Sequence, residues 1–149
     1  MEVLALLKDK AQTVFKIASN QSVDDAICLM ASGNVSALLV TKNDQPAGIF
    51  SERDVFHSYL RNRSMAFSEI ILENAMTRNL IVAESKDDIN DVMTRMIKAD
   101  ITHLPVMENE RIVGMLTLKD LMAHQIDLLT GEIHQLKDYI ADLHDAGQY

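Results

Sequence analysis

A seven-residue motif that occurs twice constrains the fold of this chain more than any other feature. The first copy is Gly48–Asp54 (GIFSERD) and the second is Gly114–Asp120 (GMLTLKD), at an offset of 66 residues. In each copy a glycine opens a short apolar run, a hydroxyl residue ends it, and a carboxylate follows three residues after the hydroxyl. The same offset aligns residues 15–56 with residues 81–122 without a gap. The chain therefore contains an internal duplication, and each copy is expected to form one structural unit.

The helices of each repeat are predicted from caps and apolar stripes. Ser22 is a predicted N-cap, and an apolar stripe with the spacing i, i+3, i+4, i+7 follows it. Gly33 and Asn34 then provide a plausible end for this helix. Asp88 takes the capping role in the second repeat. The stripes consist of Val23, Ala26, Ile27 and Met30 in the first helix and Ile89, Val92, Met93 and Met96 in the second.

The strands complete the order β-α-β-β-α in each repeat. After a β-like segment over 14–17, the apolar run 37–40 is typical of a buried strand. The turn over 42–46 is too short for a crossover, so the next strand is expected to return antiparallel. Pro105 lies within the corresponding strand of the second repeat and has no N–H to donate. That strand is therefore expected at a sheet edge, or with this position unpaired.

The duplication divides the chain into five predicted segments. The connector between the repeats contains neither Gly nor Pro and is rich in apolar residues, so it is expected to be ordered and not flexible. The apolar patch 3–7 predicts a short helix that packs on the repeats. The segments are an N-terminal segment (1–12), the first repeat (13–60), the connector (61–76), the second repeat (77–124) and a C-terminal amphipathic helix (125–149).

The C-terminal segment carries a narrow apolar seam with the a/d spacing of a coiled coil over three heptads. A stripe this narrow favours pairing with a helix of a second protomer or of a partner protein. The alternative is that the helix folds back on its own repeats. The seam consists of Met122, Ile126, Leu129, Ile133, Leu136, Ile140 and Leu143.

Composition excludes several classes of function. The net charge of -8, without any cluster of Lys and Arg, argues against nucleic-acid binding. No apolar run approaches the ~20 residues that cross a bilayer, so we expect a cytoplasmic protein without membrane contacts. A single cysteine, Cys28, excludes an internal disulfide, favours a reducing compartment and is predicted to lie in the core. No nucleophile triad, phosphate-cradling glycine loop or metal-ligand cluster occurs, so the chain is not expected to be an enzyme.

The repeated motif has a purely structural interpretation. Ser51 and Thr117 are possible N-caps, with Asp54 and Asp120 at the third helical position, which is an acidic form of the capping box. This interpretation predicts helix N-termini and requires no ligand.

The repeats also resemble a known family, the tandem cystathionine-β-synthase (CBS) domain pair or Bateman module. The resemblance covers residues 13–124 and is carried by both motif copies, by the segment 101–106 (ITHLPV) and by the lead-in 75–79 (AMTRN). The chain is similar to stand-alone bacterial CBS-pair proteins. The resemblance implies an α/β (α+β) fold of two β-α-β-β-α repeats in a pseudo-two-fold arrangement, followed by a long C-terminal helix. It also implies two clefts between the repeats that bind AMP, ADP, ATP, NAD or S-adenosylmethionine.

The resemblance gives the motif residues possible roles in such clefts. A carboxylate can accept both ribose hydroxyls, and cations, histidine and hydroxyls can donate to phosphate. Ala37 stands where the second repeat has His103, so the two clefts are expected to be unequal. The expected ligand residues are Ser51, Asp54, Thr117 and Asp120 for ribose, Arg53, Lys119, Thr102 and His103 for phosphate, and Ile17, Ile81, Val82 and Ala83 for adenine.

Two functions follow as alternatives. The first is a regulatory module that binds an adenosine-containing ligand, with AMP the leading candidate and NAD possible, and that signals as a homodimer or through an unidentified effector protein. The second is a structural dimerisation adaptor whose clefts are vestigial. Neither function requires a catalytic cofactor or a metal.

Overall fold

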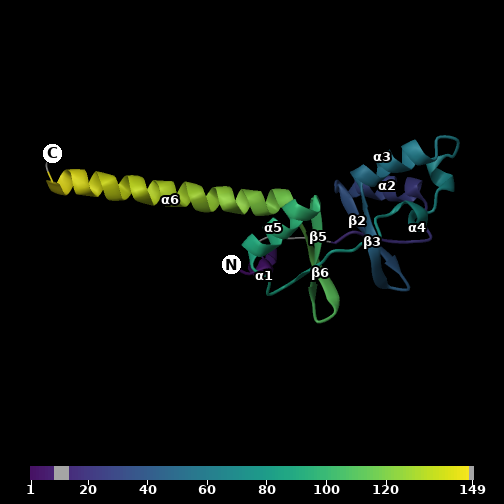
Figure 1. The fold of residues 1–149 in the computed structure, drawn as a ribbon, viewed down its shortest axis with the longest axis horizontal. Coiled ribbons are helices and arrows are strands. Elements are labelled where there is room, and N and C mark those ends of the chain that lie inside the picture. The colour runs from purple at the N-terminus through teal and green to yellow at the C-terminus, as the bar shows by residue number, and fades with distance from the viewer. Residues whose placement is uncertain (9–13, 148–149) are drawn as a thin grey trace.

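The computed structural model describes residues 1–8 and 14–147 and contains two β-α-β-β-α repeats with a long final helix (Figure 1). The predicted α/β fold class and element order are therefore confirmed. The first repeat consists of β1 (Lys16–Ala18), α2 (Val23–Gly33), β2 (Ala37–Lys42), β3 (Gln45–Ser51) and α3 (Glu52–Arg61). The second consists of β4 (Ala83–Glu84), α5 (Ile89–Ala99), β5 (His103–Glu108), β6 (Arg111–Thr117) and α6 (Leu118–Gly147). The remaining elements are α1 (Val3–Lys8), η1 (Phe67–Glu69) and α4 (Leu72–Ala75).

Each repeat forms its own three-stranded sheet, in the orders β1-β2-β3 and β4-β5-β6. The first two strands of each sheet are parallel and the last two form an antiparallel hairpin. In the first hairpin, Lys42 pairs with Gln45, so the turn is Asn43 and Asp44 alone, at φ 54 and 60. The turn is thus shorter than the predicted 42–46, because two residues with positive φ suit the twist of a tight hairpin.

Pro105 shortens the pairing between β4 and β5, the first two strands of the second sheet. In the first repeat, the Leu39 N–H donates to the Phe15 carbonyl at 3.0 Å. Pro105 is the counterpart of Leu39 and has no N–H for the Ile81 carbonyl, and β4 begins only at Ala83. The predicted edge position is therefore wrong, since β5 is the central strand. The alternative, an unpaired position on one side of the strand, agrees with the structure.

The helices begin and end largely as predicted. The Ser22 hydroxyl accepts the Asp25 N–H at 3.0 Å, and the Asp25 carboxylate accepts the Ser22 N–H at 3.1 Å, which completes a capping box. Asn34 ends α2 in the left-handed region at φ 50. The predicted core position of Cys28 is wrong because its side chain is exposed. It lies two residues from the buried Ala26, a rotation of roughly 200° about the helix axis.

The segments outside the repeats pack on them. In α1, Val3 and Leu7 are buried in the core of the second repeat, as the N-terminal apolar patch predicted. The connector packs on the first repeat, where Ile70 and Leu72 join its core and the Val23 N–H donates to the Ile70 carbonyl at 2.8 Å. The predicted start of the first repeat, at residue 13, lies outside the described residues.

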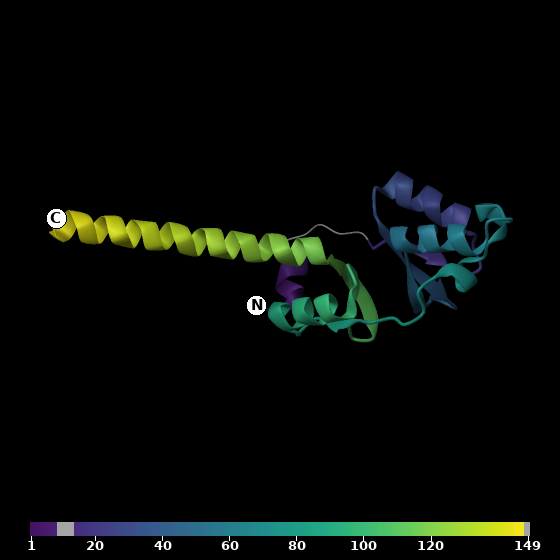
Figure 2. The same cartoon turned by 45° about the horizontal axis from the view of Figure 1, so that its top comes forward.

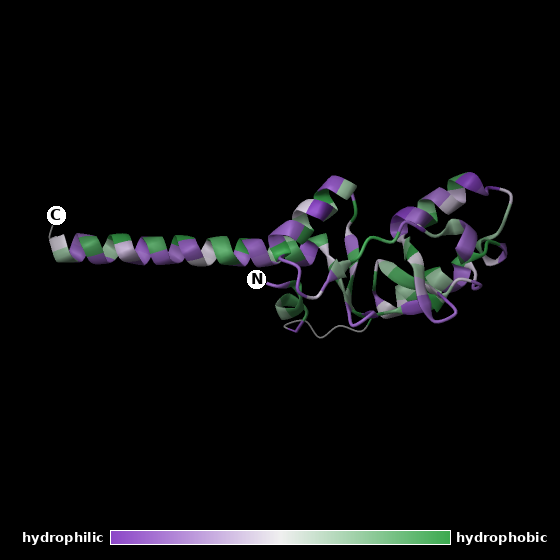
Figure 3. Ribbon diagram, turned by 60° about the horizontal axis from the view of Figure 1, so that its bottom comes forward, coloured by the Kyte–Doolittle hydropathy of each residue, from purple (hydrophilic) through white to green (hydrophobic). Residues whose placement is uncertain are grey.

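Helix α6 begins on the second repeat and then extends away from both repeats (Figures 1 and 2). Leu121, in its first turn, is fully buried in the second core, whereas Met122 is already 50% exposed. Apolar and polar residues alternate along the rest of the helix (Figure 3). The alternative that α6 folds back on its own repeats is therefore not what the structure has. Among the described helices, α6 included, none is both long and apolar enough to cross a membrane.

Candidate functional site

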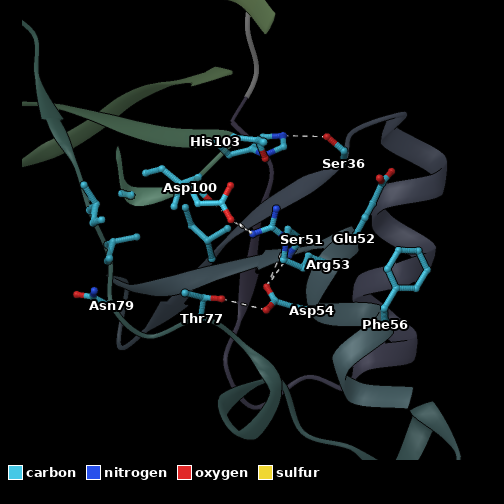
Figure 4. Close-up of a pocket in the computed structure, with 16 residues that line it drawn as sticks. Ser36, Ser51, Glu52, Arg53, Asp54, Phe56, Thr77, Asn79, Asp100 and His103 are labelled. Carbon is cyan, nitrogen blue, oxygen red and sulfur yellow. Dashed lines mark hydrogen bonds and ion pairs between the residues drawn. The ribbon is translucent and has the colours of Figure 1, made fainter. Parts of the chain in front are cut away.

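A cavity of about 670 Å³ lies between the two repeats, within the size range of small-molecule sites (Figure 4). The first repeat contributes the end of β3 and the first turn of α3. The second contributes the extended segment 77–81 that leads to β4 and the turn 99–103 between α5 and β5. The first motif copy therefore faces segments of the second repeat across this cavity.

Asp54 is a buried polar side chain on the wall of the cavity and is held by several hydrogen bonds. It is 8% exposed, and its Oδ2 accepts the Ser51 backbone N–H at 2.9 Å and the Ser51 hydroxyl at 3.3 Å. Its Oδ1 accepts the Thr77 hydroxyl at 3.0 Å. The capping interpretation of the motif is therefore correct for the link from Asp54 to the Ser51 backbone. It does not exclude a ligand, because each carboxylate oxygen has two lone pairs. The hydrogen bonds above use both lone pairs of Oδ2 and one of Oδ1, which leaves one on Oδ1 for a further donor.

The glycine that opens the first motif makes room for the segment 77–81 of the second repeat. Ile49 and Thr77 exchange two backbone hydrogen bonds, of 3.0 and 2.9 Å. A Cβ atom on Gly48 would lie 2.5 Å from the Thr77 carbonyl oxygen, closer than real Cβ contacts come. Glycine is thus required here by the close approach of the Thr77 backbone, which in turn brings the Thr77 hydroxyl to Asp54.

His103 lies at the opposite end of the cavity from Thr77 and joins the two repeats (Figure 4). Its Nε2 is 2.8 Å from Ser36 Oγ, and its Nδ1 is 2.9 Å from Thr102 Oγ1. Ser36 and Thr102 occupy the same position in the two repeats. Because a neutral imidazole donates from one nitrogen and accepts at the other, the two hydroxyls fix the plane of the ring.

Arg53 is the cation among the described residues that line the cavity, and it crosses to the second repeat. Its Nη1 is 3.3 Å from the Asp100 carbonyl oxygen and 3.5 Å from the Asp100 carboxylate. Both side chains are largely exposed, so the ion pair is weak and either group can exchange it for another partner. With Glu52 and Asp54, the described lining carries three carboxylates against one guanidinium. The cavity is therefore net negative.

The structure divides the predicted ligand residues into two groups of six. Those that line this cavity are Ser51, Arg53, Asp54, Ile81, Thr102 and His103. Those that lie elsewhere are Ile17, Val82, Ala83, Thr117, Lys119 and Asp120. Ala83 is fully buried in the second core, and the Val82 carbonyl accepts a hydrogen bond from Arg95. The structure gives no support for adenine contacts by Ala83.

The second motif copy forms a reciprocal capping box at the start of α6. The Thr117 N–H donates to the Asp120 carboxylate, and the Asp120 N–H donates to the Thr117 hydroxyl, both at 3.1 Å. The counterparts of the lead-in residues 77–81 are residues 11–15, of which 11–13 lie outside the described part of the chain. A second cleft at this motif is therefore not defined here.

Sequence reasoning assigned no role to several lining residues. Thr77 and Asn79 belong to the lead-in segment that carried part of the family resemblance, so a signal for them existed. Asp100 ends α5 at φ 54, as Asn34 ends α2, and only the facing of the two repeats brings it to the cavity. Within the described residues, no group of three His, Cys, Asp or Glu side chains is placed to hold a metal ion.

Comparison with known proteins agrees with this architecture. The chain is 25% identical over 125 residues to the CBS domain-containing protein YhcV of Bacillus subtilis, covering 83% of this chain and 87% of that protein. It is 24% identical over 123 residues to an uncharacterised protein of Methanopyrus kandleri, covering 82% of this chain and 62% of that one. It is also 28% identical over 113 residues to the inosine-5'-monophosphate dehydrogenase of Thermoplasma acidophilum, covering 75% of this chain and 22% of the enzyme. It thus spans less than two thirds of the length of the last two relatives.

Solved structures show the same fold. The CBS domain NE2398 superimposes with a TM-score of 0.79 at 31% identity, covering 85% of this chain and 98% of that chain. The CBS-domain protein ATU1752 of Agrobacterium tumefaciens gives a TM-score of 0.77 at 25% identity, with coverage of 84% and 99%. The profile of the CBS domain matches residues 11–61 and 68–127, one match for each repeat. The chain therefore belongs to the CBS-domain family and contains a tandem pair of its repeats.

Proposed function

We propose that this CBS pair is a regulatory module that binds an adenosine-containing ligand in the cavity between its repeats. The observation that carries the proposal is the buried Asp54 carboxylate on the cavity wall, held by Ser51 and Thr77. Another CBS pair, MJ0100, has been solved in complex with 5'-methylthioadenosine and S-adenosyl-L-methionine; it is 23% identical and superimposes with a TM-score of 0.72. A ligand of the same class is therefore reasonable for this cavity.

The ribose is proposed to bind at Asp54. The Asp54 carboxylate has one lone pair left on Oδ1 and accepts one ribose hydroxyl there without reorganisation. The Ser51 hydroxyl, by turning from Oδ2 to the ribose, frees a second acceptor site on Oδ2 for the vicinal hydroxyl. The adenine is proposed to lie against the apolar lining near Ile81. Pro105 does not donate to the Ile81 carbonyl, so that oxygen is a suitable acceptor for the exocyclic amine of adenine.

The phosphate is proposed to bind between Arg53 and the pair formed by Thr102 and His103. Arg53 would exchange its weak ion pair with Asp100 for the phosphate, which offers a charge-assisted hydrogen bond. The three carboxylates of the lining oppose each added negative charge. We therefore expect AMP to bind more tightly than ADP, and ADP more tightly than ATP. NAD and S-adenosylmethionine remain candidates.

The second motif is proposed to serve a weaker site of the same kind, with Thr117 and Asp120 at the ribose and Lys119 at the phosphate. The counterpart of His103 in the first repeat is Ala37, so this site has one phosphate partner fewer. We propose no catalytic role for either site. The output would pass through a homodimer or through a partner protein.

A structural dimerisation adaptor is the second candidate function. The observation that favours it is α6, whose apolar seam is exposed along a helix of 30 residues. In that case, the cavity would be a remnant and would bind no adenosine compound. The two candidates share the same assembly and differ only in the ligand, so a binding measurement separates them.

The test is a calorimetric titration of the full chain with AMP, ADP, ATP, NAD and S-adenosylmethionine, followed by Asp54→Ala. Removing this carboxylate should weaken AMP at least tenfold, because hydrogen bonds to a charged group are worth about 1.5–3 kcal/mol. Asp25→Ala is the matched control, since Asp25 closes the same kind of capping box on α2, outside the cavity. Equal affinity in both variants, or no binding of any of the five compounds to the wild type, would overturn the proposal.

A further inference from the structure

The exposed apolar seam of α6 has isoleucine at one set of heptad positions and methionine or leucine at the other. Spacings of four and three residues place Ile126, Ile133 and Ile140 at the a positions of successive heptads. The d positions are occupied by Met122, Leu129, Leu136 and Leu143. All seven side chains are between 50% and 59% exposed, so nothing in the described part of the chain covers them.

This division specifies the kind of helix that covers the seam. β-branched residues at a with leucine at d favour two parallel strands, whereas isoleucine at both positions favours trimers or tetramers. Every a position from 126 to 140 is isoleucine, and every d position from 129 to 143 is leucine. The pattern therefore fits a two-stranded coiled coil, and a second copy of α6 supplies the matching a and d residues along the whole seam.

The charges beside the seam select the orientation. Glu132 is at a g position and Lys137 is at the following e position. Five residues apart, they are not neighbours on one helix, which pairs residues three or four apart. In a parallel, in-register dimer each Glu132 faces Lys137 of the other chain, and the pair occurs twice. In a fully overlapping antiparallel pair, Glu132 would instead face Tyr139.

Leu128, at a c position and 49% exposed, is the one large apolar side chain on the opposite face of the helix over residues 126–143. The rest of this face has the character of a solvated surface. A Cβ atom on Gly131, at an f position, would meet no other atom within 4 Å. Asp138, also at f, is paired with His134 on the same helix at 3.5 Å. Glycine in mid-helix is tolerated on this outer face, where no partner packs against it.

From these observations, we infer that α6 pairs with α6 of a second copy in a parallel, in-register, two-stranded coiled coil over residues 126–143. The repeats lie at the N-terminal end of α6, so this orientation places both CBS pairs at the same end of the rod (Figures 1 and 2). Because α6 starts directly after Thr117 and includes Asp120, the coiled coil also brings the second motifs of the two chains together. The inference specifies the assembly in the proposed function and does not depend on the ligand.

Disulfide trapping tests the orientation. In a Cys28→Ser background, Leu143→Cys places one thiol at a d position near the C-terminal end of the seam. Oxidation should convert most of the protein to a covalent dimer, because in-register d positions face each other. Asp138→Cys, on the outer face, is the control and should remain largely uncrosslinked. An antiparallel pair would place residue 143 opposite residue 126, so absence of the crosslink in a protein that is dimeric would overturn the inference.

Sedimentation equilibrium tests whether the apolar seam of α6 is the surface that forms the dimer. Leu136→Asp should raise the dimer dissociation constant at least tenfold, whereas Gln135→Asp adds the same charge at an outer c position and should change it less than about threefold.

Glu132→Lys should weaken the dimer, and Glu132→Lys with Lys137→Glu should restore it. A monomeric wild type, or equal constants for Leu136→Asp and Gln135→Asp, would overturn the inference. AMP titration of Leu136→Asp keeps the two proposals distinguishable, because binding in the cavity should persist without the dimer.

Discussion

The two copies of the repeated motif have the same sequence pattern and different surroundings. In the first copy, Asp54 is 8% exposed, holds Thr77 of the second repeat and borders a cavity. In the second, Asp120 is less buried and exchanges hydrogen bonds with Thr117 at the start of α6. The helix after the first motif has 10 residues, and the helix after the second has 30. Duplication thus produced two similar units, and we propose that differences outside the motif direct the first mainly toward a ligand and the second mainly toward assembly.

The comparison predicts unequal effects for the same substitution at the two motif glycines. Gly48→Ala places a Cβ against the Thr77 backbone oxygen at 2.5 Å, and this backbone cannot rotate away. We expect a loss of about 3 kcal/mol in the free energy of unfolding, the upper part of the overpacking range. Gly114→Ala meets the end of the Leu7 side chain at 2.8 Å, which can change rotamer, and should cost about 1 kcal/mol. Urea unfolding measures both, and equal losses would contradict the difference between the motifs.

A smaller effect is expected when the residue that ends α5 is replaced by the residue type that ends α2. Asp100→Asn copies Asn34, which ends α2 in the same left-handed conformation, so the substitution should not strain the backbone. It removes a negative charge from the cavity and the ion pair with Arg53, so AMP should bind about threefold more tightly, with less gain at high salt. Asp127→Asn, on the exposed face of α6, removes the same charge far from the cavity. If both variants bind AMP alike, Asp100 does not oppose the phosphate.

The smallest expected effect is a difference between the N-terminal caps of α2 and α5 in how the stability that they contribute depends on pH. The Asn90 N–H donates to Asp88 and holds the pKa of that carboxyl below its ordinary value of 3.8. A lowered pKa contributes stability that is complete above the ordinary value and is lost as the pH falls through the lowered one. On α2, the corresponding acceptor of a first-turn N–H is the Ser22 hydroxyl, which does not titrate. The Asp25 carboxylate of that capping box accepts the N–H of the cap residue Ser22 and not a helical N–H.

Hydrogen exchange at two equivalent amides measures this difference. Ala26 donates to the Ser22 carbonyl and Val92 to the Asp88 carbonyl, at 3.1 and 3.0 Å. Between about pH 5 and pH 3, protection of the Val92 amide should fall relative to that of Ala26. A constant ratio would show that the charge of Asp88 does not matter to α5.

Local features of the fold could be predicted because each depends on neighbouring residues. The Ser22 cap, the Asn34 end of α2 and the buried stripes follow from helix periodicity, and the duplication then supplies the second repeat. Cys28 was misplaced because its neighbours are apolar, although its angular position on the helix is outward. The central position of β5 was missed because Pro105 requires only one unpaired position, which a shortened neighbouring strand supplies.

The candidate site was predicted only in part, because it forms between the repeats. Asp54 and Arg53 could be singled out, since they belong to the repeated motif. Asp100 and Ser36 could not, because nothing near them in the sequence indicates that the two repeats face each other there. The direction of α6 was left open for the same reason: an apolar seam shows that a helix needs a partner, but not whether its own repeats provide one.

The most direct test of the account is the stoichiometry of AMP binding in wild type, Asp54→Ala and Asp120→Ala, measured by calorimetry. We predict a tighter event with about one AMP per chain, weakened at least tenfold in Asp54→Ala and changed less than about threefold in Asp120→Ala. Two identical and independent sites in the wild type would contradict the different roles of the two motifs. So would a tight event that survives Asp54→Ala and disappears in Asp120→Ala.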